Sequence, residues 1–277
     1  MKSIAKYKSA LGSKPMDRAQ TRNTTRYITT KKIFIIALDG FRMAPDVSVI
    51  LPAYNVGNAV ASTIHSVREE LEGLELEIIV VDDGSTDNTS RAAASAGALV
   101  LRNNVNRGKG YSVKSGVLAS RGEKIVFMDA DGDISVDGLR HMISLLDEYD
   151  GVLACKRCPG AIYDAPVMRK VLSSGFNALV RALTGINSAD TQTGLKAFRG
   201  PQLRKIMRLV LTDRYAFDVE VLALSRLMDL RLIEVPAIIH MSKRFSVRAV
   251  LGMLTSLLTI TLRLRVLHCY QRALNGA

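Results

Sequence analysis

The chain has 277 residues, 48% of them apolar, which is enough for a globular protein with one large α/β domain or two smaller ones. The formal net charge of +12 is confined to the ends: residues 1–44 carry ten Lys and Arg against two acids, and residues 243–277 carry six against none. There is no Trp, and no basic stretch alternates with aromatic residues, so composition excludes a nucleic-acid surface built on base stacking.

The N-terminal 44 residues are predicted to form a basic, poorly ordered extension. Met43 stands directly before the first predicted strand, where a shorter chain could start. The apolar run IFIIAL is too short to be the core of a secretion signal with a cleavage site behind it. This segment is therefore excluded from the predicted fold.

From residue 45 short β-branched runs alternate with longer helical stretches, which predicts a largely parallel α/β sheet flanked by helices. One helix is expected to open at the cap candidates 87–89 and close on Gly97, and another to run from Ser135 to Gly151. Further helices are predicted near 169–185 and over 215–229. Strands are predicted over 47–53, 76–83, 98–103, 124–130, 151–157, 194–200 and 231–241.

The C-terminal region 243–277 contains an uncharged, apolar stretch from Ala249 to Leu262, bounded by Arg248 and Arg263. It is shorter than the roughly 20 residues that span a bilayer, so no spanning helix is predicted. Basic flanks beside an apolar face indicate an amphipathic helix that lies at a membrane surface. The alternative interpretation is a helix packed on the protein's own core.

The three cysteines, Cys155, Cys158 and Cys269, are odd in number and lack the spacing of a disulfide framework. CKRC could be interpreted as a redox motif, but it follows a strand-like segment and has no second pair to complete a metal site. The prediction is buried or incidental thiols in a reducing compartment.

Three acids follow the strand predicted at KIVFM, namely Asp129, Asp131 and Asp133. Alternate residues of a strand point to the same side, so these carboxylates would repel each other unless a cation binds them. Oxygen ligands are preferred by Mg²⁺ and Mn²⁺. An EF-hand is excluded because Arg140 occupies the twelfth position of such a loop.

Polar residues also follow the strands that end in LPAYN and VVDDGSTDNT. Ligands of open α/β sheets bind at the carboxyl ends of strands, so these segments and the acids are expected to line one crevice. Neither GxGxxG nor a P-loop is present, but NRGKG, with Lys109, offers backbone amides and a cation to a phosphate. A cation beside carboxylates is suited to holding a nucleotide pyrophosphate.

Taken together, VSVILPAYN, EIIVVDDGSTDNT, NVNRGKGYSVKSG and IVFMDADGD resemble the family 2 glycosyltransferases of the GT-A fold, over about residues 45–270. DTQTGLKAFRG and FDVEVL are similar to the subgroup that acts on dolichyl or other polyprenyl phosphates, and the apolar C-terminus is similar to the membrane-proximal tail of its glucosyltransferases. The resemblance implies a Rossmann-like catalytic domain over 45–242. It also implies a peripheral location on the cytoplasmic face of a membrane.

The resemblance assigns a donor end to the site. Asp83 would contact the nucleobase, Asp129 and Asp131 would hold the metal and the donor diphosphate, and Lys109 would assist there. Asp133 stands where related mannosyltransferases often place a glutamine metal ligand. The wall of the base pocket would be formed by Pro52, Ala53 and Tyr54.

The resemblance assigns an acceptor end as well. CKRC occupies the place of the family's Gly-Ser-Arg strand end, so Arg157 would bind the acceptor phosphate together with Arg169 and Ser173. Asp190 and Gln192 would line the sugar pocket. Lys243 and Arg244 would belong to a mobile basic loop that also meets the acceptor.

The implied reaction is the metal-dependent transfer of a hexose, with inversion, from UDP-glucose or GDP-mannose to the lipid phosphate, with glucose favoured. Asp131, Arg157, Arg169 and Asp190 are the candidate catalytic residues. Two alternatives stay open. A transferase for saccharide acceptors would need a base, for which Asp190, Asp218 or Glu220 would serve, and a peripheral membrane protein could bind nucleotide or lipid without turnover.

Overall fold

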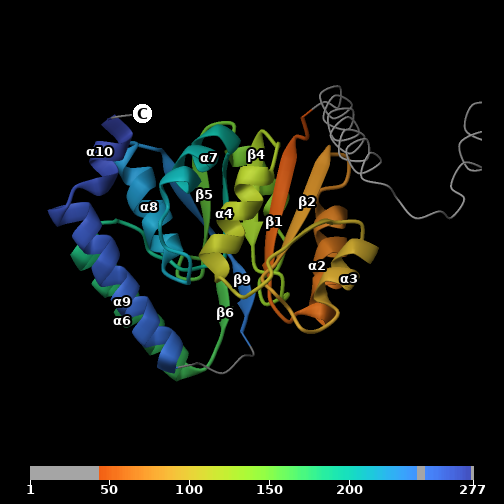
Figure 1. The fold of residues 1–277 in the computed structure, drawn as a ribbon, viewed down its shortest axis with the longest axis horizontal. Coiled ribbons are helices and arrows are strands. Elements are labelled where there is room, and N and C mark those ends of the chain that lie inside the picture. The colour runs from red at the N-terminus through yellow and green to blue at the C-terminus, as the bar shows by residue number, and fades with distance from the viewer. Residues whose placement is uncertain (1–43, 242–246, 276–277) are drawn as a thin grey trace, which may run out of the picture. The chain divides into compact units, whose positions relative to one another are not determined.

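The computed structural model describes residues 44–241 and 247–275 of the chain (Figure 1). All but the last residue of the predicted N-terminal extension lies outside this range, as do Lys243 and Arg244. The described residues from Pro45 onward belong to one compact unit.

A seven-stranded sheet forms the centre of this unit, in the order β3-β2-β1-β4-β7-β5-β8. All neighbouring strands are parallel except β7, which runs antiparallel to both β4 and β5. The predicted, largely parallel sheet is therefore confirmed. The strands are β1 (Val47–Ala53), β2 (Leu76–Asp82), β3 (Leu99–Arg102), β4 (Lys124–Met128), β5 (Gly151–Cys155), β7 (Leu195–Arg199) and β8 (Leu232–Pro236).

Helices cover both faces of the sheet. Because strand side chains alternate, Ile50 packs into a core layer with α4, α6, α7 and α8, whereas Val49 and Leu51 pack into a second layer with α2, α3 and α5. The two layers explain why the strands read as continuous apolar runs. The helices are α2 (Gly57–Glu70), α3 (Thr89–Ser95), α4 (Lys109–Ala119), α5 (Leu139–Leu145), α6 (Val167–Thr184), α7 (Gly200–Leu209), α8 (Phe217–Leu227), α9 (Val247–Thr261) and α10 (Cys269–Asn275), with a π-helical turn at Leu262–Val266.

Several predicted element boundaries are wrong. The helix expected to close on Gly151 ends at Leu145, and Gly151 begins β5. The strand expected over 124–130 ends at Met128. The helix expected from Ser135 starts only at Leu139, because Gly138 adopts the left-handed conformation, with φ of 83°, directly before it. The strand expected over 231–241 divides into β8 and β9 (Ile238–His240) next to Pro236, which has no backbone N–H for a ladder. Strand β9 pairs instead with β6 (Ile162–Asp164) in a separate two-stranded parallel ribbon.

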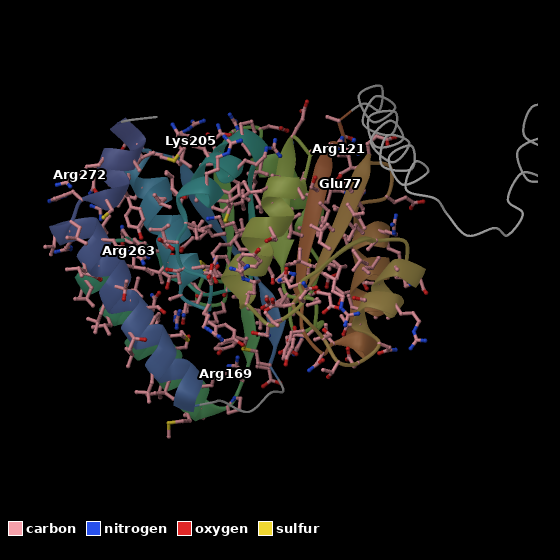
Figure 2. All side chains as sticks on the ribbon, viewed as in Figure 1. Glu77, Arg121, Arg169, Lys205, Arg263 and Arg272 are labelled. Atoms are coloured by element: carbon pink, nitrogen blue, oxygen red, sulfur yellow. A yellow bond between two sulfur atoms is a disulfide. The ribbon has the colours of Figure 1, made fainter. Side chains whose placement is uncertain are left out.

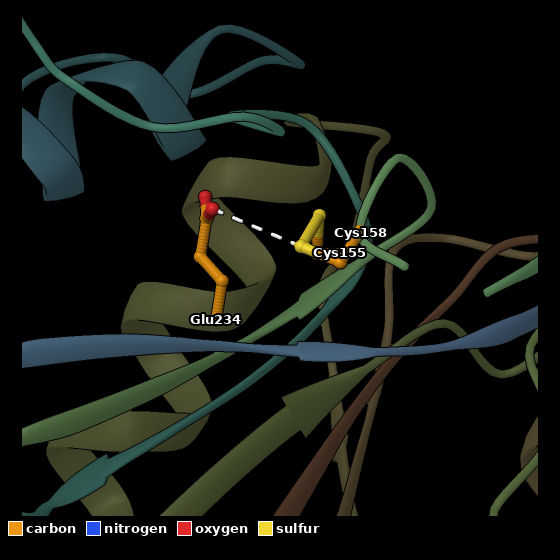
Figure 3. A group of neighbouring side chains, drawn as sticks. All are labelled: Cys155, Cys158 and Glu234. Atoms are coloured by element: carbon orange, nitrogen blue, oxygen red, sulfur yellow. Dashed lines mark hydrogen bonds between the residues drawn. A yellow bond between two sulfur atoms is a disulfide. The ribbon is translucent and has the colours of Figure 1, made fainter. Parts of the chain in front are cut away.

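Cys155 and Cys158 are joined by a disulfide, so the prediction of free thiols is wrong for these two residues. Strand β5 ends at Cys155 and the chain turns at once, which brings the two Cα atoms to 5.5 Å. Sulfur Sγ of Cys158 also lies 3.9 Å from a carboxylate oxygen of Glu234 on β8 (Figure 3). Cys269 in α10 is a free thiol.

The helix predicted near the C-terminus forms, and α9 lies beside α6 (Figure 1). It buries Leu257 and Ile260 in the core, while Leu251 and Leu258 are 59% and 61% exposed. Helix α6 also exposes large apolar side chains, namely Val167, Met168 and Val171. In the described part of the chain, no helix combines the length and the apolar character that crossing a bilayer requires.

Candidate active site

A cavity of about 480 Å³ lies where the carboxyl ends of β1, β2 and β4 meet, as the sheet topology predicts for a ligand site. Most of the sequence-predicted site residues line it. Arg157 and Asp190 are not among its lining residues, and Lys243 and Arg244 lie outside the described range. The predicted residues in the wall are Pro52, Ala53, Tyr54, Asp83, Lys109, Asp129, Asp131, Asp133, Arg169, Ser173 and Gln192, together with the candidate base Asp218.

Asp83 fixes the loop that leads into α4. Its carboxylate accepts hydrogen bonds from the side chain of Asn103 at 2.7 Å and from the backbone N–H groups of Arg107 and Gly108 at 2.9 and 2.7 Å. Gly108 has φ of 110°, and a Cβ at this position would lie 2.5 Å from the carbonyl oxygen of Asp213. The loop therefore brings the N-terminus of α4 against the cavity in a conformation that a glycine permits.

The three acids after β4 all line the cavity, although β4 itself ends at Met128. Their arrangement is set by a loop rather than by strand alternation, because Gly132 turns the chain with φ of 79°. The backbone N–H of Asp133 donates to a carboxylate oxygen of Asp131 at 3.3 Å. The backbone carbonyl of Asp133 accepts a hydrogen bond from the backbone N–H of His240 in β9 at 2.9 Å, which ties the acidic loop to the two-stranded ribbon.

Lys109, the first residue of α4, places its Nζ 2.5 Å from Oδ1 of Asp129. Burial disfavours the charge on this ammonium group, but the nearby carboxylates of Asp129 and Asp218 outweigh burial and raise the pKa of Lys109 above its ordinary value. Lys109 is therefore a permanent cation beside the acids.

The acidic loop fits a hard divalent cation. The carboxylate of Asp129 lies directly against Gly194, where a Cβ would come within 2.1 Å of Oδ2 and displace it. Asp129, Asp131 and Asp133 all line one cavity, and their carboxylates are the donor type that Mg²⁺ and Mn²⁺ prefer. The chemistry of these donors fits such an ion, whose remaining ligands would come from a diphosphate and water.

Another part of the cavity wall consists of Arg169 and Ser173 from the first turns of α6, together with Tyr163 of β6. Figure 2 shows Arg169 beside the end of α6 that leads back to β6. The guanidinium of Arg157 lies behind Ser173 and donates to its hydroxyl at 2.8 Å. The wall of the cavity thus contains a group of acids after β4 and, from α6, the cation Arg169.

Asp190 is fully buried in a network that holds the loop before β7. Its carboxylate binds Nζ of Lys156 at 2.8 Å and accepts from the backbone N–H groups of Lys156 and Gln192 at 3.0 and 3.1 Å. Burial alone would raise the pKa of this carboxyl, but Lys156 and the hydroxyl of Thr193 outweigh burial and hold it at about 2. Asp190 is therefore an anchor for Gln192, which does line the cavity.

The other candidate bases are also bound to neighbouring groups. Asp218 is buried and forms an ion pair of 2.6 Å with Lys196 of β7. Glu220 is buried and accepts hydrogen bonds from the Tyr270 hydroxyl and from the backbone N–H groups of Leu211 and Thr212. These contacts favour structural roles for both carboxylates.

Several cavity residues escaped the sequence analysis. Lys156 lines the wall, although the sequence analysis of CKRC named only Arg157 as a site residue. Ser112 of α4 also lines it, and its buried hydroxyl has no hydrogen-bond partner among the described residues. Asn106, Gly108 and Ala130 lie within the motifs NRGKG and DADGD but were not themselves singled out. The remainder come from segments that no motif signalled, namely Val56, Tyr163, Leu172, Phe176, Arg214, Tyr215, Met241 and Met253.

Comparison with solved structures reveals the same fold elsewhere. Glucosyl-3-phosphoglycerate synthase from Mycobacterium tuberculosis superposes with a TM-score of 0.61 at 21% identity, covering 79% of each chain. Mannosyl-3-phosphoglycerate synthase from Rubrobacter xylanophilus superposes with a TM-score of 0.58 at 20% identity, covering 79% of this chain and 74% of that one. At these identities the likeness concerns the fold.

Sequence comparison identifies more similar proteins. A dolichyl-phosphate beta-glucosyltransferase of Dictyostelium discoideum is 31% identical over 68% of this chain and 64% of its own length. The enzyme of the same name from Drosophila melanogaster is 32% identical over 69% of this chain and 65% of its own length. The chain thus spans just under two thirds of these relatives. The family model described as Glycosyl transferase family 2 matches residues 48–206, more than half of the chain, and the protein belongs to this family.

Proposed function

We propose that the protein transfers a hexose, glucose in preference to mannose, from a nucleotide diphosphate sugar to a dolichyl or other polyprenyl phosphate, with inversion at the anomeric carbon. The observation that carries the proposal is the composition of the cavity wall, in which the acids after β4 are joined by Arg169 and Ser173 of α6, beside helices with exposed apolar side chains. The names of the similar curated proteins support the choice of glucose and of a lipid phosphate.

The donor occupies the acidic end. Pro52, Ala53 and Tyr54 form the wall against which the nucleobase packs, beside Asp83. Lys109 lies where the diphosphate meets the acids, and Asp129 and Asp131, with Asp133 beside them, hold Mg²⁺ or Mn²⁺. When bound, this ion neutralises charge on the departing nucleoside diphosphate.

The acceptor phosphate lies against Arg169 and Ser173. A phosphate monoester has a second pKa of about 6, so its oxygen is already an anionic nucleophile at neutral pH and needs no protein base. The protein's task is to position this oxygen in line with the anomeric carbon, and hydrogen bonds from Arg169 and from Ser173, which Arg157 holds in place, serve that task. The sugar lies between the two ends, beside Gln192, which Asp190 anchors.

The lipid part of the acceptor lies toward α6 and α9. Leu172 and Phe176 of α6 and Met253 of α9 line the cavity on this side, so an apolar chain attached to the phosphate has apolar neighbours. The exposed apolar side chains of both helices would enter the lipid surface, with the protein peripheral on its cytoplasmic face.

A saccharide acceptor is the second candidate function, because the glycosyltransferase fold accommodates it. That reaction needs a general base near the acceptor hydroxyl. Asp190, Asp218 and Glu220 are buried and bound to lysine, hydroxyl or backbone donors, which favours the phosphate acceptor over this alternative.

The test is incorporation of sugar into lipid. Purified protein is incubated with Mn²⁺ or Mg²⁺, polyprenyl phosphate and radiolabelled UDP-glucose or, in parallel, GDP-mannose, and label in the organic phase is counted. Label from UDP-glucose is expected, with loss on chelation and in the variant Asp131→Asn. Asp137→Asn, an exposed acid in the same segment but outside this cavity, is the matched control. Nucleotide binding without label in lipid would refute the proposal.

A further inference from the structure

The turn between Cys155 and Cys158 carries two adjacent cations, Lys156 and Arg157, beside the acceptor end of the cavity. The turn is held by the disulfide and by Asp190, which accepts a hydrogen bond from the backbone N–H of Lys156 at 3.0 Å. The two side chains have different partners. Their contacts decide which one faces the ligand.

The guanidinium of Arg157 is directed toward protein acceptors. It donates to the hydroxyl of Ser173 at 2.8 Å and to the carbonyl oxygen of Ala189 at 3.3 Å, and it lies 3.5 Å from a carboxylate oxygen of Asp190. It is not among the residues that line the cavity in the described part of the chain. Its contacts join α6 to the loop before β7.

Lys156, by contrast, is among the residues that line the cavity, together with Arg169 and Ser173. An ammonium group has three N–H donors, and among the described residues Lys156 donates to Asp190 at 2.8 Å and to Thr193 at 3.3 Å. One donor is left for a ligand. The ring of Tyr163 lies 5.7 Å from this ammonium group and bounds its space on one side.

We propose that Lys156, rather than Arg157, is the residue of this turn that binds the anionic group of the acceptor, next to Arg169 and Ser173. The inference rests on the proposed function and adds a binding residue to it. Asp190 and the disulfide hold Lys156 in position, so binding of the phosphate costs little side-chain entropy at this residue.

The test measures binding apart from transfer. Farnesyl phosphate, a short polyprenyl monophosphate, is titrated calorimetrically into the protein, and UDP with Mn²⁺ is titrated separately. Lys156→Met is expected to weaken farnesyl phosphate binding at least tenfold, and Lys156→Arg, which keeps the charge, to weaken it less than threefold. An unchanged dissociation constant for UDP serves as evidence that each variant is folded.

Lys170→Met is the matched control, because the ammonium of Lys170 lies 5.6 Å from the same tyrosine ring but is exposed and does not line the cavity. It is expected to bind both ligands as the wild type does. Farnesyl phosphate binding unchanged in Lys156→Met, or an equal loss of UDP binding, would overturn the inference. Binding that depends on Lys156 in a protein that transfers no sugar would refute the proposed function and leave the inference standing.

Discussion

The ammonium group of Lys109 lies 2.5 Å from Oδ1 of Asp129, which joins the first residue of α4 to the acidic loop after β4. The two segments come from separate strand–helix units and meet because β4 lies beside β1 in the sheet. A cation is thus built into the acidic end of the cavity. It offsets part of the repulsion among the carboxylates and faces the space assigned to a diphosphate.

Removing this cation should weaken donor binding. Lys109→Met is expected to raise the dissociation constant of UDP about tenfold or more, because a hydrogen bond to a charged group contributes roughly 1.5–3 kcal/mol. Calorimetric titration with UDP and Mn²⁺ measures the effect. Lys114→Met removes a cation from the same helix outside the cavity and should leave UDP binding unchanged. Equal losses in the two variants would contradict a role for Lys109 at the diphosphate.

Gly194 should be indispensable for the metal site. A Cβ at this position would lie 2.1 Å from Oδ2 of Asp129, so Gly194→Ala must push this carboxylate aside. We expect the Mn²⁺ concentration for half-maximal transfer to rise at least tenfold. Gly175→Ala is the matched control, because a Cβ on this α6 residue meets nothing within 4 Å and alanine favours the helix. Unchanged metal dependence in Gly194→Ala would place the ion elsewhere.

Asp190 should stabilise the fold in a pH-dependent way. Its folded-state pKa of about 2 lies below the ordinary value of 3.8, so its contribution is present above about pH 4 and is lost as the pH falls toward 2. Asp190→Asn should therefore lower the free energy of unfolding at pH 7 by about 2 kcal/mol. Urea titrations should show the difference from wild type shrinking between pH 4 and pH 3. Asp147→Asn, at an exposed pair with Lys124, should change stability little.

The disulfide can be tested by counting thiols. Unreduced, denatured protein should show one reactive thiol, that of Cys269, and reduced protein should show three. The closed loop is short, so reduction should lower the free energy of unfolding by about 2 kcal/mol or less. It should also raise KM for the lipid acceptor with no change in UDP binding, because the bond holds the turn beside the acceptor end. Cys269→Ser should change none of these quantities.

The exposed apolar side chains of α9 should attach the protein to lipid. Leu258→Glu is expected to weaken cosedimentation with anionic phospholipid vesicles at least tenfold, because burying a leucine is worth about 1.5–3 kcal/mol. Leu99→Glu makes the same change at an exposed leucine on edge strand β3, and vesicle binding should persist. If the wild type, Leu258→Glu and Leu99→Glu all bound vesicles equally, the protein would have to bind the membrane through another surface.

The sheet and the acidic end of the site were predictable because both depend on local patterns. Apolar runs gave the strand over 47–53 with the bounds that the structure has. The positions of Asp83 and Asp129 follow from a general rule, since the carboxyl ends of neighbouring parallel strands meet at one edge of the sheet.

Which side chains line the acceptor end depends on the tertiary structure and cannot be inferred from the spacing of residues in the sequence. Which of Lys156 and Arg157 faces the cavity is decided by a turn, and the same turn brings Cys155 and Cys158 together. Likewise, Gly194 reaches Asp129 only because β7 runs against its neighbours, which delivers the residues before it to the ligand-binding edge. Strand direction is a property of the assembled sheet.

The ion pair between Lys196 and Asp218 has a consequence for the fidelity of folding. Lys196 is fully buried, lies opposite Phe127 in the pairing of β4 with β7, and points to the side of the sheet that α8 covers. If β7 paired with β4 one residue out of register, the ammonium group of Lys196 would point into the opposite, apolar layer. Asp218 would then lose Lys196 as its partner. The misaligned sheet would thus carry two separated buried charges. Correct alignment, which also brings Gly194 to Asp129, is the arrangement in which these charges meet.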